Sequence, residues 1–347
     1  MSKRPPKHGA KIENKHTLLI DGNALFKVGF FGARNEYNHK GQHIGGLYSF
    51  LTILRKILNE NLIHRVYVFW DGKFSGKLRY NIYKPYKSGR GKDYINGTEP
   101  DQEEMVQKMM IWNYLEELCI RQLQHEFVES DDFIAYYCKT MDENENITIC
   151  TNDRDMCQLI NEKVRIYFFD LKTYVDNVNY SLFFSHHFEN SSLIKTITGD
   201  NSDSIKGIKG VKEATLVSLF PEIKTKKVTL NEIISLAKEA QQKRLDERKK
   251  PLKSLDNIIN SVTDGPQAEM IYEINSMLVD LKNPLITEDA VSALEELKNG
   301  EFNTDERTFK NVINFIKNDG LDASIGRNRY EEFLLPFKKL LGREKNY

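Results

Sequence analysis

The sequence predicts an α/β fold in which a mostly parallel sheet is flanked by helices and followed by a helical C-terminal region. Between residues 17 and 190, short apolar runs rich in Val, Ile, Phe and Tyr alternate with amphipathic stretches of helical length. After about residue 190 the strand signals fade and only helical patterns remain. Repeated strand–helix–strand units are typical of a doubly wound sheet, and the remainder indicates a second, helical region.

The predicted strands are nearly continuous apolar runs. Such runs suit strands that are buried on both faces of a parallel sheet, because neither face meets water. In chain order they are TLLID (17–21), RVYVFWD (65–71), HEFVE (125–129), ITICTND (147–153) and RIYFFDL (165–171).

The predicted helices lie between these strands and along the rest of the chain, where apolar residues recur at helical spacing. The segment QQKRLDERKKPLKS (241–254) is dense in charge and contains Pro251, so we expect an exposed helix end and loop there. The predicted helices are 45–60, about 101–122, 132–141, 191–198, 211–219, 229–249, 266–280, 288–298, 306–318 and 328–342.

Composition limits the class of protein. The chain has 347 residues, 40% of them apolar, and no apolar run reaches the roughly 18 residues of a membrane span. The basic start lacks an apolar signal segment, so residues 1–16 are expected to form a solvated, mobile tail. Four cysteines form no C-x-x-C pair, which favours reduced thiols and a cytoplasmic location: Cys119, Cys138, Cys150 and Cys157.

Charge is balanced in total but uneven along the chain. The sum of 50 Lys and Arg against 50 Asp and Glu argues by itself against a nucleic-acid-binding protein. Residues 73–92, however, carry seven cations and no acid: Lys73, Lys77, Arg79, Lys84, Lys87, Arg90 and Lys92. Such a stretch favours contact with phosphates, and the alternative is a solvated loop.

Four of the predicted strands end in an acid, namely Asp21, Asp71, Glu129 and Asp153. The carboxyl ends of parallel strands lie along one edge of an open sheet, so these acids are expected to be neighbours. Crowded carboxylates raise each other's pKa, and a divalent cation removes that conflict. Hard oxygen ligands of this kind suit Mg²⁺ or Mn²⁺.

Five further acids extend this set to nine. They are Asp131 and Asp132 in ESDD, Asp155 in TNDRD, and Asp200 and Asp203 in GDNSD. Each acid alone could be a helix cap, but acids at four separate strand ends favour a metal site. Two ions about 4 Å apart can activate a water and stabilise the leaving oxygen of a phosphoryl displacement. No G-x-S-x-G, GxGxxG or P-loop motif indicates another chemistry.

Six segments, in this order, resemble the flap endonuclease / 5′–3′ exonuclease family of PIN-like nucleases. They are TLLIDGN, VFWDGKFSGKLR, KPYKSGRGK, VESDDFIAYY, TNDRDMCQLI and ITGDNSDSIKGIKGVKEA. The similarity is greatest to bacteriophage enzymes, including the phage ribonuclease H that removes RNA primers, and to the 5′-nuclease domain of bacterial DNA polymerase I. It covers about residues 17–220, with a looser match at 270–285. A phage-encoded protein would act in the host cell cytoplasm.

The resemblance implies a PIN-like (Rossmann-like) nuclease domain at 17–190 with two Mg²⁺ ions, for which Mn²⁺ can substitute. By motif match, the inner metal cluster comprises Asp21, Asp71, Glu129 and Asp131. The second cluster comprises Asp153, Asp155, Asp200 and Asp203, with Asp132 beside both.

The resemblance also places a helical arch for a 5′ single strand at about 73–122, with 101–122 on its far side. Lys87 and Arg90 match catalytic cations that face the scissile phosphate, and Arg79 assists them. Tyr86 is similar to an aromatic residue on which a base stacks. Further DNA contacts in the arch are assigned to Lys73, Lys77 and Lys84.

The segment IKGIKGVKEAT (205–215) resembles the helix-three-turn-helix that grips duplex DNA, so residues 191–347 are interpreted as a helical DNA-binding region. Gly207 and Gly210 would allow close approach to phosphate, and Lys206, Lys209 and Lys212 would neutralise it. The chain departs from the family pattern at Lys212 and Ala214. The alternative is an ordinary helical hairpin with glycine turns.

The leading hypothesis is a structure-specific 5′ nuclease that removes RNA primers or 5′ flaps in DNA replication or repair. Its partners would be DNA with a 5′ flap or 5′ single-stranded end, RNA–DNA hybrids and replication proteins, and we expect a monomer with no membrane contact. One alternative is a PIN-type ribonuclease for single-stranded RNA, which needs the acids but neither the arch nor the 205–215 hairpin. Another is a catalytically silent DNA-binding scaffold, which typically loses acids, whereas all nine are present here.

Overall fold

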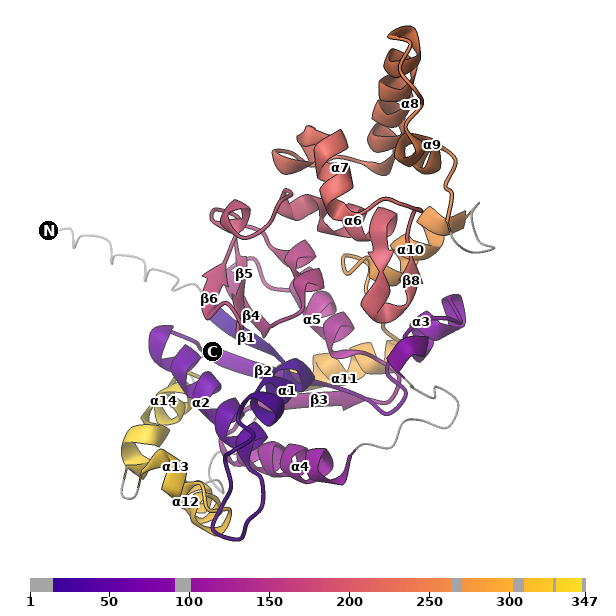
Figure 1. The fold of residues 1–347 in the computed structure, drawn as a ribbon. Helices are drawn as coiled ribbons and strands as arrows, with labels where there is room; N and C mark the ends of the chain where they lie inside the picture. Colours follow the sequence, from indigo (N-terminus) through magenta and orange to yellow (C-terminus); the bar gives the residue numbers. More distant parts are fainter. Residues whose placement is uncertain (1–14, 91–100, 264–269, 302–308, 327–328, 345–347) are drawn as a thin grey trace, which may run out of the picture.

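The centre of the molecule is a six-stranded sheet with strand order β3-β2-β1-β4-β5-β6 (Figure 1). The computed structural model describes residues 15–90, 101–263, 270–301, 309–326 and 329–344. Five strands are parallel, and β6 joins the β5 edge in the antiparallel sense. The strands are β1 (Lys15–Asp21), β2 (Arg65–Asp71), β3 (Arg121–His125), β4 (Glu145–Thr151), β5 (Val164–Phe168) and β6 (Thr173–Val175). The predicted α/β fold with a mostly parallel sheet is confirmed.

The third predicted strand is wrong in position. The strand β3 lies at Arg121–His125, whereas the prediction was 125–129. It is an outer strand whose glutamines, Gln122 and Gln124, are not buried, so it lacks the apolar run that marks the central strands. The apolar residues Phe127 and Val128 instead belong to the connection that leads into the next helix.

Two helical layers cover the sheet. Leu18 and Ile20 of β1 pack toward α1 (Gly22–Gly32), α2 (Gly45–Glu60) and α4 (Gln102–Glu117). Leu19, between them, faces the opposite side, where it packs with α5 (Ser130–Lys139). This alternation explains why the central strands read as continuous apolar runs. The helix predicted at 45–60 is confirmed at Gly45–Glu60.

The helices after residue 190 form two groups. The first group has its own core and includes α6 (Ser191–Thr198), α7 (Glu213–Leu219), α8 (Leu230–Asp246), α9 (Lys253–Ile259) and α10 (Ile271–Val279). The second returns to the sheet region, where α11 (Glu288–Asn299) adds Leu294 to one layer and α14 (Tyr330–Glu344) adds Phe337 to the other. The second group also holds α12 (Phe309–Asn318) and α13 (Asp322–Ile325). The helices after residue 190 thus contribute both to a core of their own and to the layers that cover the sheet.

Short elements line the carboxyl edge of the sheet. They are α3 (Lys77–Ile82), the 3₁₀ turns η1 (Ser88–Arg90), η2 (Arg154–Leu159) and η5 (Asn201–Asp203), and the two-stranded ribbon of β7 (Gly199–Asp200) and β8 (Ile205–Lys206). The remaining 3₁₀ turns are η3 (Tyr180–Leu182), η4 (Phe188–Asn190) and η6 (Pro221–Lys224).

Some predictions concern segments outside the described residues. These are residues 1–14 of the expected tail, and residues 91–100 of the expected arch, which include Lys92. The strand β1 begins at Lys15, so the last two residues assigned to the tail belong to the sheet. None of the helices in the described ranges has the length and apolar character needed to cross a bilayer. All four cysteines are free thiols.

Candidate functional site

The carboxyl ends of β3, β2, β1 and β4 lie side by side, because these four parallel strands are neighbours in the sheet. Asp21 and Asp71 are the last residues of β1 and β2, and Asp153 follows β4 by two residues. Glu129 lies after β3, at the N-terminus of α5, and Asp131 is in the first turn of that helix. The topology thus brings the strand-end acids to a single edge, which we call the carboxylate edge.

Ser130 connects three of these acids. Its backbone N–H donates to Asp71 Oδ1 at 2.9 Å, and its hydroxyl lies 3.4 Å from both Asp21 Oδ1 and Asp131 Oδ1. The Thr151 hydroxyl donates to Asp21 Oδ2 at 3.1 Å and accepts from the backbone N–H of Asp153 at 3.0 Å. Neither hydroxyl was predicted as part of the site, although Ser130 stands inside the ESDD motif.

The helix-cap alternative is also correct for some of these acids. Asp21 accepts the N–H of Ala24 at 3.0 Å, and Asp153 accepts the N–H of Asp155 at 2.8 Å. A carboxylate has two oxygens and about four lone-pair sites, so capping leaves capacity for other ligands. Capping fixes the orientation of these carboxylates at the carboxylate edge and does not exclude a second role.

The acids at this edge repel one another. Burial and the nearby charge of Asp71 raise the pKa of Asp21 to about 7. Burial, followed by the charges of Asp153 and Asp21, raises the pKa of Asp131 well above its usual range. In the described part of the chain, the structure shows no basic side chain paired with Asp21, Asp71, Asp131 or Asp153.

This donor set fits hard divalent cations. All its side-chain donors are oxygens, from carboxylates and the hydroxyls of Ser130 and Thr151, which are the ligands that Mg²⁺ and Mn²⁺ prefer. Within the described residues, no three Asp, Glu, His or Cys side chains are placed so that they could together hold one metal ion. The carboxylate edge therefore offers oxygen donors and negative charge but not a ready-made metal site.

Arg79 and Asp132 form a buried ion pair. Asp132 is only 1% exposed and accepts two hydrogen bonds from the Arg79 guanidinium, at 2.5 and 3.0 Å. It also accepts the backbone N–H of Leu285 at 2.8 Å. Arg79 is buried as well, and its Nε donates to the carbonyl of Leu278 at 2.9 Å. These two side chains join α3, α5 and the chain near α10, and their predicted roles at a phosphate and at a metal stay predictions.

Glu129 forms ion pairs with two cations. Arg79 donates to its Oε2 at 2.7 Å, and the ammonium group of Lys87 forms an ion pair with its Oε1. Burial opposes a charged Lys87, but Glu129 and nearby acidic groups outweigh it, so the pKa of the lysine is raised well above its usual value. The backbone of Lys87 has φ 52°, and its N–H donates to the carbonyl of Asp203 at 2.8 Å. Lys87 therefore stands between Glu129 and Asp203, beside the carboxylate edge.

Tyr86 is buried in this structure, and its predicted role as a stacking surface stays a prediction. The residue is 3% exposed and packs in a small core with Tyr83, Ile205 and Leu278. Its hydroxyl donates to Glu129 Oε2 at 3.1 Å. The aromatic ring thus serves packing, and its hydroxyl orients a carboxylate of the site.

The predicted second cluster is paired with cations. Lys195 of α6 contacts Asp155 Oδ1 at 2.9 Å and forms an ion pair with Asp200. Burial and Asp153 raise the pKa of Asp155 to about 7, although Lys195 opposes the shift. Asp203 pairs with Arg90 at 2.6 Å, and the Arg90 side chain is 45% exposed. Lys195 was not predicted as part of the site. The one feature of the sequence that links it to the site is its position five residues before Asp200 of the GDNSD motif.

The other predicted arch lysines lie at the surface of α3 and its approach. Lys73 and Lys84 are exposed, and Lys84 Nζ lies 4.4 Å from the centre of the Tyr80 ring. Lys77 Nζ lies 5.4 Å from the rings of both Phe74 and Phe127. Lys73 follows Asp71 by two residues, and the surface positions of these lysines suit contact with phosphate.

The glycine-rich segment 205–212 presents its lysines outward. Lys206, Lys209 and Lys212 are exposed, whereas Ile208 and Val211 between them are buried. The two glycines differ: a Cβ on Gly207 would lie 2.0 Å from the Thr198 carbonyl oxygen, whereas Gly210 faces open space with φ +72°. Gly207 is therefore required by contact within the protein, and Gly210 by its backbone conformation.

A Ser–His–Glu arrangement elsewhere was not expected. His186 Nδ1 lies 2.9 Å from Glu213 Oε1, and its Nε2 lies 3.2 Å from the Ser191 hydroxyl. The Ser191 hydroxyl donates to the carbonyl of Phe188 at 2.8 Å, and Ser191 is buried. Because its proton is committed to a backbone carbonyl, the serine holds η4 against α6 and is not placed for attack on a substrate.

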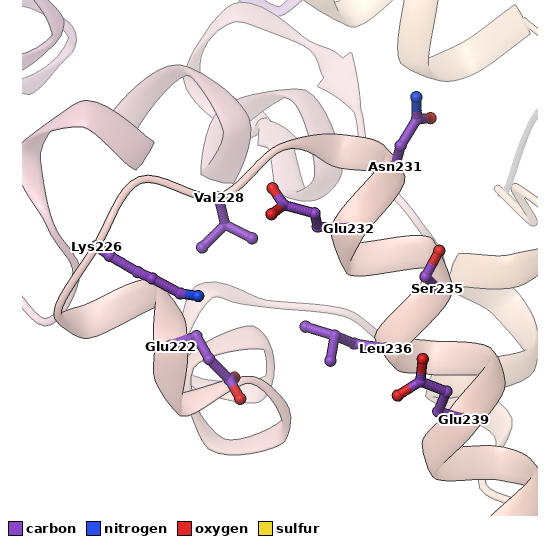
Figure 2. A pocket seen from close by; sticks show the side chains of 8 residues that line it. All are labelled: Glu222, Lys226, Val228, Asn231, Glu232, Ser235, Leu236 and Glu239. Carbon is purple, nitrogen blue, oxygen red and sulfur yellow. The ribbon is translucent and has the colours of Figure 1, made fainter.

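One hollow lies away from the carboxylate edge. It has a volume of about 390 Å³ between η6 and α8, with Val228 and Leu236 among its lining residues and Glu222, Lys226 and Glu239 around them (Figure 2). None of the nine acids lines it. The carboxylate edge remains the candidate site.

Known protein sequences include relatives of this chain. Residues 16–188 match the family described as "5'-3' exonuclease, N-terminal resolvase-like domain". DNA polymerase I of Bacillus subtilis (strain 168) is 28% identical over 263 residues, covering 73% of this chain and 28% of that protein. A 5'-3' exonuclease of Buchnera aphidicola subsp. Schizaphis graminum is 24% identical over 228 residues, covering 65% of this chain and 77% of that protein. The chain thus spans about a quarter of the polymerases it matches.

Comparison with solved structures supports the fold. The T5 D15 protein co-crystallised with metal ions has a TM-score of 0.56 at 17% identity, covering 95% of this chain and 100% of that one. The bacteriophage T5 D15 flap endonuclease in a complex with DNA and metal ions gives 0.54 at 18% identity over the same shares. These structures share the fold, and the match over residues 16–188 shows that the chain belongs to the family of 5′–3′ exonuclease N-terminal, resolvase-like domains.

Proposed function

We propose that this protein is a structure-specific 5′ nuclease, a 5′–3′ exonuclease and flap endonuclease that hydrolyses phosphodiester bonds. The observation that carries the proposal is the group of four carboxylates at the carboxyl edge of the sheet, Asp21, Asp71, Asp131 and Asp153, which have no paired base among the described residues. Family membership and the resemblance to a flap endonuclease fold support the same activity.

The reaction needs two Mg²⁺ ions, for which Mn²⁺ can substitute. When bound, such ions lower the pKa of a water and neutralise charge on the phosphate. Asp21, Asp71, Glu129 and Asp131 would hold one ion, and Asp153, Asp155, Asp200 and Asp203 the other. The charge of Asp153 raises the pKa of both Asp131 and Asp155, which indicates that Asp153 lies near both proposed ion sites.

The chain's own residues would bind and orient the substrate. Arg90 is largely exposed beside Asp203, so its guanidinium can turn to a phosphate oxygen without losing a buried contact. Lys87 would keep Glu129 in place and offer its charge to the scissile phosphate. Ser130 and Thr151 fix the orientations of Asp21 and Asp71.

The substrate class follows from the charged surfaces next to the site. Exposed lysines on both sides, at 73–84 and 206–212, suit a single strand on one side and a duplex on the other. We infer that the substrates are DNA with a 5′ flap or 5′ single-stranded end and RNA–DNA hybrids, processed during replication.

The test is cleavage of a 5′-labelled flap duplex that carries a short RNA end, with and without Mg²⁺. The wild-type protein should release the flap only with Mg²⁺ or Mn²⁺. Asp71→Ala should lower the single-turnover rate by about a thousandfold or more while leaving fold and DNA binding intact. Glu331→Ala, an exposed acid on α14, is the matched control and should cleave normally. Full activity of Asp71→Ala with magnesium would exclude the proposed site.

A plain RNA strand assayed in parallel distinguishes the proposed nuclease from the alternative, a PIN-type ribonuclease for single-stranded RNA. A PIN-type single-strand ribonuclease would cleave it as fast as the flap, whereas the proposed enzyme requires the junction. Equal rates on the two substrates would therefore replace the proposal with the ribonuclease.

A further inference from the structure

The hairpin formed by α8 and α9 ends in a strongly basic tip. Figure 1 shows this hairpin projecting from the end of the molecule opposite α12 and α13. Residues 243–253, which we call the basic tip, hold six cations and two acids. Most of these side chains are exposed. The cations are Lys243, Arg244, Arg248, Lys249, Lys250 and Lys253.

The basic tip has a defined shape. Gln241, which is buried, accepts the backbone N–H of Leu252 at 3.1 Å and donates to Asp256 Oδ1 at 2.6 Å. The Arg244 guanidinium donates twice to the carbonyl of Lys250, at 3.1 and 3.0 Å. Arg248 adopts φ 58°, which turns the chain between the helices. These contacts fix the backbone of the turn and the Arg244 side chain, so the chain that carries the cations needs no reordering when it binds.

The hairpin is attached to the glycine-rich segment 205–212. The side chain of Asn257 in α9 donates to the carbonyl of Lys209 at 2.8 Å, and the Lys209 N–H donates to the carbonyl of Val262 at 2.8 Å. Ile208 forms an antiparallel bridge with Thr263. Residues 257–263 at the base of the hairpin are therefore joined to this segment by backbone and side-chain contacts.

Its acids do not cancel the positive charge. Glu247 pairs with Lys249 at 2.7 Å, and Asp246 accepts a hydrogen bond from Gln242 at 2.8 Å. Six cations minus two acids leave a formal charge of +4 on residues 243–253. An exposed group of this charge suits a polyanion with regularly spaced charges more than it suits a single small anion.

We propose that the basic tip is a second binding site for the phosphate backbone of duplex DNA, beyond the contact made by residues 205–212. This inference rests on the proposed function, because it requires that the segment 205–212 lies on the duplex arm of the substrate. With a rise of 1.5 Å per helical residue, α9 separates the basic tip from Lys209 by roughly 10 Å. That offset corresponds to roughly three base pairs of duplex, so the basic tip would reach phosphates farther from the junction.

The test compares Lys249→Ala/Lys250→Ala with a matched control, Lys310→Ala/Lys339→Ala, which removes two exposed lysines on α12 and α14. Each protein is titrated with two catalytically inert duplexes, one that ends at the 205–212 segment and one that continues past the basic tip. The tip variant should bind the long duplex about tenfold more weakly, with a salt slope reduced by about two, and bind the short duplex normally. The control should match the wild type on both.

Two results would overturn this proposal: an unchanged affinity of the tip variant for the long duplex, or an equal loss on the two duplexes. A flap-cleavage assay of the same proteins tests the nuclease assignment separately from the second binding site. If the wild type cleaves the flap but the tip variant binds normally, the second binding site fails while the nuclease assignment stands. If the tip controls affinity for the long duplex but no protein cleaves with Mg²⁺, the nuclease assignment fails and duplex binding by the tip stands.

Discussion

At the scale of single residues, the acids of the site differ in whether a base balances their charge. Glu129, Asp200 and Asp203 each contact a Lys or Arg side chain, whereas Asp21 and Asp131 depend on hydroxyls and backbone N–H groups. A buried carboxylate without a base is costly to ionise, so its pKa rises. The protonation of these acids is therefore expected to change near neutral pH, where a divalent cation would favour their ionised form.

In solutions without divalent ions, we expect the free energy of unfolding to fall as the pH rises from about 4 to about 7. Asp21 and Asp155 have pKa values raised to about 7, so across this window the folded protein holds protons that the unfolded chain has released. Each group can contribute up to about 1.4 kcal/mol per pH unit. Urea unfolding in EDTA at several pH values measures this slope, and Mg²⁺ should restore stability at the upper end. Stability that rises with pH across the window would contradict the prediction.

Lys195→Met tests the base in the second cluster. The ammonium group of Lys195 and a divalent ion compete for the same oxygens of Asp155 and Asp200, so removing it should tighten Mn²⁺ binding by about tenfold. Without metal, the variant should lose about 1 kcal/mol of stability, since the lysine is partly exposed. Calorimetric titration with Mn²⁺ measures the affinity, and Lys238→Met on α8 is the control. Equal Mn²⁺ affinities in all three proteins would rule out this competition.

At the scale of elements, the approach of α6 to β8 depends on a residue without a side chain. Gly207 follows β8 directly and lies against the carbonyl at the end of α6, whereas Gly210 is three residues farther and open to solvent. The two glycines look equivalent in the sequence, yet one is fixed by contact and the other by φ. Substitution should therefore affect them differently.

Gly207→Ala should destabilise the protein by about 3 kcal/mol, because the new Cβ would overlap the backbone of Thr198. Gly210→Ala should cost only about 1 kcal/mol, the strain of an alanine at φ +72°. Thermal unfolding of both variants gives the comparison, and DNA binding by the folded Gly210 variant should persist. Similar losses in the two variants would show that the contact with Thr198 is not the reason for Gly207.

At the scale of the whole molecule, the C-terminal helices belong to the core of the α/β region. Phe337 of α14 is fully buried and packs with residues of β2 and α2. Arg65 and Arg121, at the starts of β2 and β3, pair with Glu344 at 2.8 and 2.9 Å. The last helix therefore closes a layer of the sheet, far along the chain from the strands that it covers.

Phe337→Ala should lower the free energy of unfolding by about 3–5 kcal/mol, because it opens a cavity in this layer. The catalytic rate per folded molecule should stay normal, since α14 contributes no residue to the carboxylate edge. Urea unfolding and single-turnover cleavage measure the two effects, with Leu335→Ala at an exposed α14 position as the control. A stability equal to that of the wild type would contradict the packing described here.

The sequence by itself determined the α/β class, most of the strands and the gathering of acids at one edge of the sheet. These follow from local rules: apolar runs mark strands buried on both faces, and parallel strands end together. The outer strand β3 was not predicted at its correct position, because its polar residues Gln122 and Gln124 interrupt any apolar run. The edge strand β6 is only three residues long and too short to give a pattern.

Only the tertiary structure decided which acids have a base beside them. Arg79 and Asp132 lie 53 positions apart, and Lys195 meets both Asp155 and Asp200, so no local pattern could reveal these pairs. The burial of Tyr86 was not predicted either, because sequence does not report burial. The return of α14 to the sheet also depends on long-range packing. Local patterns fix which elements form, whereas contacts between distant segments fix which charges are neutralised and which remain to bind a metal or a phosphate.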